Sequence, residues 1–298
     1  MTQLKALAGL AAVEVNEGRM AEARMRRSEA LALARELDDV VAECAALNGL
    51  ANIDFAQGRL DEARATFEAA LARARDAGDL TWQCALLGNL GAVYANVGHM
   101  EEAQRCFEQA LPLARQLGDK QREGHTLCNM GMLHLVQKRF DKSIAASEEA
   151  LQVARDLGHA RLEGIVQCNL GLAHEERGHS HEALTCFDAA LRAVRQLADR
   201  RSEGQFLGYL GRTKGRLEMF DEARGCFATG EALLRQVSDT LSLAVLLCDR
   251  AECDWRAGAT GAARIARDEA RAIADAARTG PESELGQALA RVDRLLGT

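Results

Sequence analysis

The chain has 298 residues, of which 48% are hydrophobic, so it has enough apolar surface for a packed interior and is not expected to be disordered. Its formal charge at pH 7 is −7, a mild acidity that gives no reason to expect nucleic acid or an anionic membrane as a partner. Two prolines and only 4% aromatic residues favour helices over strands.

One pattern recurs along the chain every 40 residues. It begins with a small residue inside a predicted helix: Ala11, Ala51, Gly91, Gly131, Gly171, Gly211 and Ala251. Seven residues later comes a turn position: Gly18, Gly58, Gly98, Lys138, Gly178, Glu218 and Gly258. Glycine at most of these turns suits a left-handed residue that ends a helix. Four repeats then carry a phenylalanine nine residues after the turn: Phe67, Phe107, Phe187 and Phe227.

Each repeat is predicted to form two antiparallel helices, at about Leu80–Val97 and Met100–Leu117 in the third, because its apolar residues recur with a period near 3.6. The phenylalanines are expected to fill the space between one repeat and the next. Aspartates stand where they can cap the following helix: Asp79, Asp119, Asp199 and Asp239. Pro112 lies inside the second helix of the third repeat, where we expect a bend.

The segments NLGAVYANVGHMEEAQRCFEQAL (89–111) and NLGLAHEERGHSHEALTCFDAAL (169–191) resemble the tetratricopeptide (TPR) repeat family, and the resemblance extends over about residues 4–280. The 40-residue period is similar to that of Pins-type polarity adaptors, kinesin light chains and arrays attached to bacterial kinases and ATPase-type regulators. The resemblance implies an all-α fold: an α-solenoid wound as a right-handed superhelix, with the first helix of each repeat lining a concave groove.

The predicted organisation is a single array over residues 1–298. Its seven repeats are 1–40, 41–80, 81–120, 121–160, 161–200, 201–240 and 241–280. Thr279-Gly280-Pro281 breaks the pattern, and the segment 281–298 is expected to form a capping helix from Glu282 to Leu296. The first repeat has no such cap, so it either caps itself or belongs to a longer protein.

Asparagine stands two residues before the small residue in three successive repeats, at Asn89, Asn129 and Asn169. Because asparagine is a poor residue for a helix interior, its amide should have a compensating use. In related families an asparagine here contacts bound peptide, and the resemblance carries that role to these positions. An asparagine bonded to a neighbouring helix would explain the same pattern, so both interpretations remain open.

Four further groove residues are placed one or five positions after the small residue: Asn52, Asn96, Arg212 and Arg216. The two arginines predict acidic residues in the part of a partner that lies near them. Chaperone-binding members of the family clamp a terminal carboxylate with lysine and asparagine. The lysine positions here hold Asn48, Gly88, Cys128, Cys168 and Gly208. A binder of chaperone tails is therefore disfavoured.

Three histidines, His174, His179 and His181, lie among glutamates and suggest a zinc site. The first two are five residues apart rather than four, and the turn at Gly178 separates them, so no metal is expected. No phosphate-binding glycine loop, nucleophile elbow or solitary cysteine beside a histidine occurs. We therefore expect neither catalysis nor a bound cofactor.

The nine cysteines include no Cys-x-x-Cys pair, which favours reduced, packed thiols in a cytoplasmic protein over a disulfide framework. No apolar run approaches the length of about 18 residues that a membrane span needs, and the first ten residues lack a signal peptide's apolar block. Together these features predict a scaffold that binds a peptide or helix of a partner protein. The alternative is a sensory or oligomerisation module cut from a larger bacterial regulator of the kinase or ATPase type.

Overall fold

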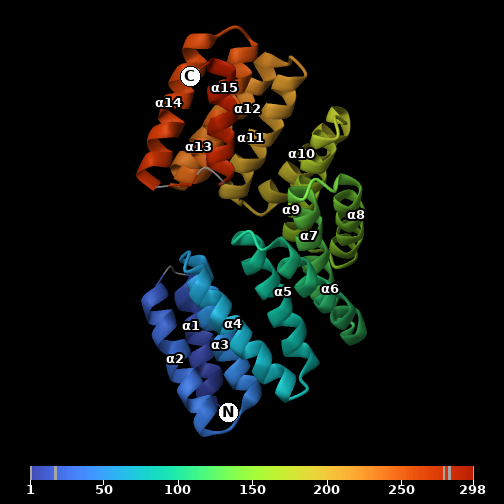
Figure 1. The fold of residues 1–298 in the computed structure, drawn as a ribbon, viewed down its shortest axis with the longest axis vertical. Helices are drawn as coiled ribbons and strands as arrows, with labels where there is room; N and C mark the ends of the chain where they lie inside the picture. Colours follow the sequence, from blue (N-terminus) through green and yellow to red (C-terminus); the bar gives the residue numbers. More distant parts are fainter. Residues whose placement is uncertain (1, 17–18, 278, 281–282, 298) are drawn as a thin grey trace. The chain divides into compact units, whose positions relative to one another are not determined.

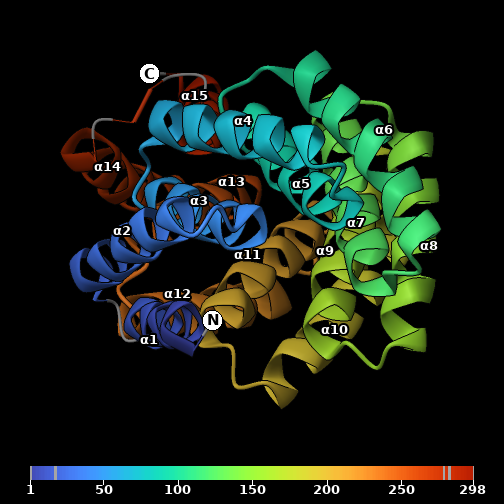
Figure 2. The same ribbon diagram turned by 90° about the horizontal axis from the view of Figure 1, so that it is seen from below.

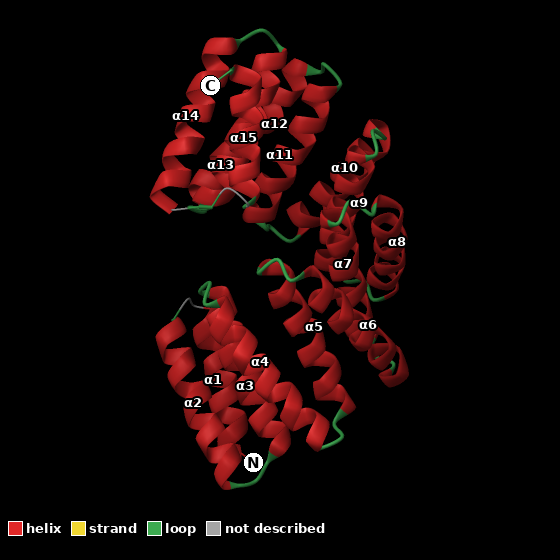
Figure 3. Ribbon diagram, in the orientation of Figure 1, coloured by secondary structure: helices red, strands yellow, loops and turns green. Residues whose placement is uncertain are grey.

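The computed structural model describes residues 2–16, 19–277, 279–280 and 283–297. Within these ranges the chain forms fifteen α-helices and no β-strand (Figure 1, Figure 3). In chain order the helices are α1 (Thr2–Asn16), α2 (Met20–Glu36), α3 (Val40–Ala56), α4 (Leu60–Asp76), α5 (Leu80–Asn96), α6 (Met100–Leu117), α7 (Lys120–Val136), α8 (Phe140–Asp156), α9 (Ala160–Glu176), α10 (Ser180–Gln196), α11 (Arg200–Arg216), α12 (Phe220–Gln236), α13 (Thr240–Arg256), α14 (Thr260–Ala277) and α15 (Glu284–Leu296). Seven helix pairs and one terminal helix confirm the predicted all-α solenoid.

The chain divides into two compact units, residues 1–133 and 134–298, and the boundary falls inside α7. In each unit, helices that follow one another in sequence pack side by side, as α1 to α4 do in Figure 2. The first helices of successive repeats also contact one another: α1 with α3, α3 with α5, α9 with α11, and α11 with α13. We call these contacting first helices the first-helix layer of each unit.

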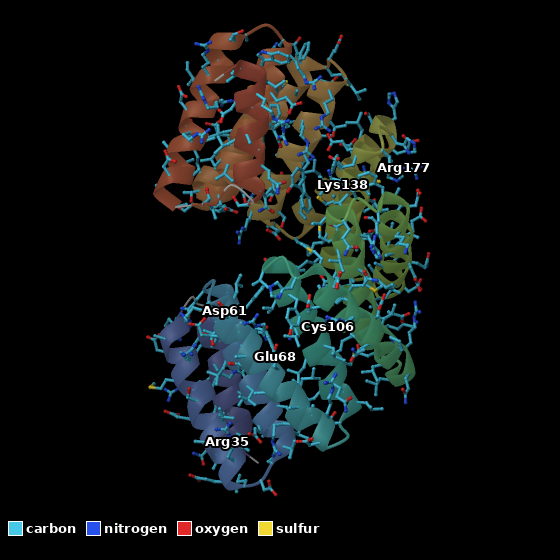
Figure 4. The ribbon with its side chains drawn as sticks, viewed as in Figure 1. Arg35, Asp61, Glu68, Cys106, Lys138 and Arg177 are labelled. Atoms are coloured by element: carbon cyan, nitrogen blue, oxygen red, sulfur yellow. The ribbon has the colours of Figure 1, made fainter. Side chains whose placement is uncertain are left out.

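In the second to seventh repeats, left-handed backbone ends the first helix at the predicted place. Positive φ angles occur at all six turn positions that the structure describes: Gly58 (75°), Gly98 (84°), Lys138 (57°), Gly178 (79°), Glu218 (62°) and Gly258 (78°). Gly18 lies outside the described residues. Lys138, labelled in Figure 4, and Glu218 adopt this conformation although a β-carbon makes it less favourable. The repeat geometry therefore prevails over the local preference of these two residues.

The small residue of the first helix makes room for the phenylalanine of the second. A β-carbon would lie 2.5 Å from the Phe107 ring at Gly91, 2.6 Å from the Phe187 ring at Gly171 and 2.8 Å from the Phe227 ring at Gly211. Phe107 also shares a buried cluster with Leu133 of the next repeat. The ring thus fills space toward the next repeat, which confirms its predicted role. It also packs against the glycine of its own repeat, a contact that was not predicted.

Aspartate caps open most first helices, as predicted. Their carboxylates accept a hydrogen bond, 2.9–3.2 Å long, from the backbone N–H three residues later at Asp39, Asp79, Asp119, Asp199 and Asp239. At the start of α9 the Nδ1 atom of His159 accepts the equivalent bond from Leu162 over 3.2 Å. Most first helices are therefore capped by an aspartate that can be identified in the sequence.

The C-terminal helix begins later than predicted. It starts at Glu284, because Ser283 accepts a bond from the Gly286 N–H over 3.0 Å and so caps it. Pro281 and Glu282, where the helix was expected to start, lie outside the described residues. The apolar face of α15 shares one buried cluster with α13 and α14 through Leu285, Ala288, Leu289, Val292 and Leu296. This confirms the predicted capping role.

Helix α6 continues through Pro112 without interruption, from Met100 to Leu117. It ends at Gly118 in the left-handed conformation, with φ of 67°. Proline removes one backbone donor from a helix interior and crowds the preceding turn. The bend expected at Pro112 stays a prediction.

Candidate functional site: the first-helix layer

A pair of asparagines joins two neighbouring first helices of the first unit. The Nδ2 atom of Asn89 in α5 donates to Oδ1 of Asn48 in α3 over 2.8 Å. Asn89 is half-buried, and the bond uses only part of the donor and acceptor capacity of two amides. This bond fits the interpretation in which a residue of a neighbouring helix satisfies the hydrogen-bonding groups of Asn89. It also holds the Asn89 amide in a fixed orientation at the surface.

Among the other predicted asparagines of the first unit, Asn52 and Asn96 are more exposed than Asn89. Asn52 is exposed and lines, with Asn48, a cavity of about 260 Å³. Asn96 is exposed and donates to the Ala92 carbonyl of its own helix over 2.9 Å. Asn129 in α7 is half-buried. The first unit therefore presents uncharged amides on α3, α5 and α7, the helices that were predicted to carry them.

Asn169, the third member of the predicted row, differs from the other two. It lies in α9 of the second unit and exposes only 3% of its surface, whereas Asn89 and Asn129 are half-buried. A partner has little access to its amide. The three asparagines share a register, but they do not share the exposure that a common binding role needs.

In the second unit the first-helix layer is crossed by a network of buried ion pairs. Arg212 of α11 binds Glu175 of α9, with 2.5 Å between Nη2 and Oε2, and lies 3.5 Å from Asp249 of α13. Arg216 also reaches Glu175, at 3.1 Å, and the Thr213 hydroxyl donates to the same carboxylate over 2.9 Å. Glu175 thus receives donors from three residues of the next repeat.

The network continues to the terminal helix. Arg291 of α15 binds Asp249 at 2.7 Å and Glu252 at 2.9 Å, and Glu252 also binds Arg256 at 3.0 Å. Three carboxylates from α9 and α13 are therefore matched by arginines from α11, α13 and α15. Arg212 and Arg216, which were predicted to offer positive charge to a partner, have carboxylate partners within their own unit.

The pKa shifts follow from burial and from these charges. Burial raises the pKa of Glu175, but the charges of Arg212 and Arg216 and the hydrogen bonds from Arg212 and Thr213 outweigh it, so the net pKa lies below the ordinary value. Burial likewise raises the pKa of Asp249, and here the attraction of Arg212 and Arg291 does not fully offset it. Arg212 stays charged because both carboxylates raise its pKa.

Sequence reasoning missed Asp249 and Arg291. A signal for Asp249 exists, because Arg212 lies 37 residues after Glu175 and 37 residues before Asp249, so acid, base and acid alternate on successive first helices. No comparable spacing marks Arg291, because α15 does not follow the 40-residue register.

The repeats match one known family model. The model described as tetratricopeptide repeat matches residues 2–76, 41–116, 82–135 and 122–196, which together run from 2 to 196 of the 298 residues. The chain belongs to the tetratricopeptide repeat family. A comparison of the TPR chain with curated protein sequences gave no match.

Three solved structures illustrate the breadth of TPR arrays with this fold. A signal transduction ATPase with numerous domains (STAND) and a tetratricopeptide repeat sensor, from Pyrococcus horikoshii, has a TM-score of 0.72 and 18% identity, covering 96% of this chain and 44% of its own. A Rap protein complexed with Competence and Sporulation Factor has a TM-score of 0.65 and 13% identity, covering 99% and 97%. NprR in complex with its cognate peptide NprX has a TM-score of 0.62 and 14% identity, covering 82% of this chain and 71% of its own. At these identities the likeness concerns the fold alone.

The cysteines of the TPR array behave as packing residues. All nine are free thiols, and seven of them are buried. Burial raises the pKa of Cys106 and Cys186 to about 11 and that of Cys248 to about 12. A catalytic thiol needs a lowered pKa, so these thiols are poor nucleophiles.

The histidine cluster lies at the turn of the fifth TPR repeat. The rings of His174 and His179 are 6.0 Å apart, and burial lowers the pKa of His174. His181 is exposed. Among the residues that the structure describes, no three metal-ligating side chains are grouped so as to hold an ion. In the same ranges no helix combines the length and the apolar character that crossing a membrane requires.

Proposed function

We propose that this TPR array is a non-catalytic scaffold that binds a peptide or a helix of a partner protein on the first helices of its repeats within residues 1–133. The observation that carries the proposal is the set of accessible amides on α3, α5 and α7: Asn52, Asn89, Asn96 and Asn129. An amide both donates and accepts, so it can bind the backbone of a peptide whatever its side chains. The bond from Asn89 to Asn48 holds one of these groups, the Asn89 amide, in place before a ligand arrives.

The second unit has a different role in this proposal. Arg212 and Arg216 already pair with the buried carboxylate of Glu175. A ligand that bound these two arginines instead would leave that carboxylate without a counter-charge. We therefore assign these two arginines to the stability of the array, and the ligand contacts to the asparagines. The complex of NprR with its cognate peptide NprX supports peptide binding by the same fold, and Rap, which also has this fold, is complexed with Competence and Sporulation Factor.

The nine free thiols suit a reducing compartment, so we place the protein in the cytoplasm.

A second candidate function is that of a sensory module within a larger regulator. The similarity over 96% of this chain to a STAND protein with a tetratricopeptide repeat sensor favours it. The mass of the denatured polypeptide, measured in an extract of the cells that make it, separates the two: a chain mass well above 32.3 kDa identifies a module of a longer chain.

The test of the scaffold function uses the full chain as immobilised bait, with an Asn52→Ala, Asn129→Ala double variant beside it. We expect the wild type to retain a partner protein. A synthetic peptide of that partner's binding segment should bind the double variant about five- to a hundred-fold more weakly than the wild type. Helix content and melting temperature should be the same for both baits. A partner that binds both baits equally would place the interaction elsewhere on the array.

A further inference from the structure

The first repeat carries a charge where other repeats carry an aromatic ring. Arg27 of α2 lies 40 residues before Phe67, at the register position of the buried phenylalanines. Those four rings expose at most 1% of their surface. The guanidinium of Arg27 therefore lies at the space between the first helices α1 and α3. In the repeats with phenylalanine, the ring fills the equivalent space.

Arg27 crosses the backbone of α3 at Gly49. A β-carbon at Gly49 would lie 2.6 Å from Cδ and 2.8 Å from Cζ of Arg27, so a larger residue here would force the arginine side chain to shift. Two cavities, of about 230 and 260 Å³, lie between α1 and α3, and Arg27 lines both of them. The first borders the N-terminal halves of the two helices and the second their C-terminal halves, so Arg27 stands between the cavities.

Both cavities are lined mainly by aliphatic atoms. The first is bordered by Leu4, Ala8 and Ala46 and the second by Val15, Met20 and Ile53, among others. Lys5 and Asp39 also border the first cavity, and their opposite charges offset each other. Arg27 therefore leaves one uncompensated positive charge between two apolar spaces.

Within the described ranges, Arg27 makes no hydrogen bond, ion pair or ring contact. The carboxylates on the neighbouring helices already have partners. Glu14 of α1 lies 3.7 Å from Arg26, and Asp54 of α3 binds Arg24 and Arg59, each at 2.5 Å. The carboxylate of Asp39 caps α3. Burial lowers the pKa of Arg27, as expected for a half-buried cation without a nearby anion.

The seventh repeat shows how this fold satisfies an arginine in the same register. Arg267 of α14 is the equivalent of Arg27, and its Nη1 lies 2.9 Å from Oδ1 of Asp293 in α15, which is 26 residues further along. The residue 26 positions after Arg27 is Ile53, which has no charge. The last repeat thus supplies an acid to its arginine from the following helix, whereas the first repeat does not.

We propose that the crevice between α1 and α3 binds a partner segment in which an acidic residue is flanked by aliphatic residues. The carboxylate binds the guanidinium of Arg27, whose planar fork suits two parallel hydrogen bonds. The aliphatic side chains enter the two cavities, since an apolar cavity of about 150 Å³ already accepts a benzene-sized guest. This inference rests on the proposed scaffold function and specifies the chemistry of its partner.

The test selects a phage-displayed library of random peptides against the full chain. We expect the enriched peptides to share an Asp or Glu beside Leu, Ile, Val or Met. Changing that acid to its amide should weaken binding about ten- to a hundred-fold, measured by the anisotropy of the labelled peptide. Arg27→Met should weaken binding to a similar extent, and the two changes together should have little more effect than either alone.

Matched variants separate charge from fold. Arg27→Lys keeps the charge without the fork and should retain part of the affinity, whereas Arg27→Gln should not. Arg105→Met removes an exposed arginine of the same unit and should bind like the wild type. Arg27→Met should melt no lower than the wild type, because no ion pair is lost. If it fails to fold, Arg27→Gln and Arg27→Lys still report the charge dependence.

Four outcomes would overturn the inference. Enriched peptides without an acid, or peptides bound equally by Arg27→Met, would refute the Arg27 site and leave the scaffold function standing. A wild-type dimer that Arg27→Met converts to a monomer would make a second copy of this chain the occupant instead of a separate partner. A folded chain that enriches no peptide and retains no partner would refute the scaffold function as well.

Discussion

Arg212 binds Glu175 at two points, with 2.5 Å between Nη2 and Oε2 and 3.2 Å between Nε and Oε1. The Glu175 side chain exposes 1% of its surface and that of Arg212 exposes 12%, so both charges are largely removed from water. The opposite side of the guanidinium lies 3.5 Å from Asp249. One arginine therefore neutralises carboxylates from the repeats before and after its own.

Arg212→Met should destabilise the second unit by up to about 3–5 kcal/mol, because it removes one of the two arginines that pair with each of the buried carboxylates of Glu175 and Asp249. Chemical denaturation of the full chain, followed by circular dichroism, measures the loss. Arg224→Met is the control: its side chain is 53% exposed and pairs with Asp221, which is 95% exposed, so a change within about 0.5 kcal/mol is expected. Equal effects of the two variants would show that the Arg212 network contributes no special stability.

Glu43 predicts how the stability of the first unit depends on pH. Its carboxylate binds Arg35 (labelled in Figure 4) and Arg73, each at 2.9 Å. The hydrogen bond of Arg35, aided by Arg73, holds the pKa of Glu43 below its ordinary value of 4.5 despite burial. The folded state thus binds a proton less readily than the unfolded chain, so the contribution of Glu43 is complete above the ordinary value and is lost as the pH falls through the folded pKa.

Glu43→Gln should therefore flatten the fall of melting temperature between about pH 5 and pH 3 and lower the melting temperature near pH 7. Glu62→Gln changes an exposed glutamate of the next helix and should leave the curve as it is. Melting scans at several pH values decide the matter. A Glu43→Gln curve parallel to that of the wild type would mean that this carboxylate is not coupled to folding.

Two glycines of α5 should respond oppositely to alanine. At Gly91 a β-carbon would lie 2.5 Å from the Phe107 ring, whereas at Gly88 nothing lies within 4 Å of it. Gly91→Ala should cost about 1–3 kcal/mol through overpacking, and Gly88→Ala should stabilise the helix by up to about 1 kcal/mol. Denaturation curves of the two single variants measure both changes. A loss of stability at Gly88 as large as that at Gly91 would contradict the proposed fit of glycine to ring.

The repeat register was predictable because each of its elements depends on local sequence. Gly91, Phe107 and Asp79 recur at fixed offsets, and their roles in close approach, filling and capping follow from residue type alone. An inter-repeat ion pair recurs in the same way, with arginine eight residues before glutamate. It occurs at Arg35–Glu43, Arg115–Glu123, Arg155–Glu163 and Arg195–Glu203, with N–O distances of 2.8–3.2 Å.

The candidate site was less predictable, because a register position does not determine exposure or pairing. Asn169 and Asn129 occupy equivalent positions, yet one is buried and the other is half-buried. Arg212 and Arg27 are both cations on or beside the first helices, but of the two only Arg212 forms an ion pair with acids of this chain. Such differences depend on side chains some 37 to 42 residues away, which a single repeat's pattern does not contain.

The asparagine row should divide into a structural and a binding part. Asn169 is 3% exposed, so Asn169→Ala should destabilise the second unit by about 1–3 kcal/mol as buried hydrogen-bonding groups lose their partner. Asn129 is half-buried, and Asn129→Ala should change stability by less than about 0.5 kcal/mol, because alanine's better helix propensity offsets the lost contacts. Both variants are compared by denaturation and then by the affinity of any peptide that the wild type binds. If Asn129→Ala unfolds the array while leaving that affinity intact in the folded fraction, the amide at this position is structural. The binding role of Asn129 would then have to be abandoned.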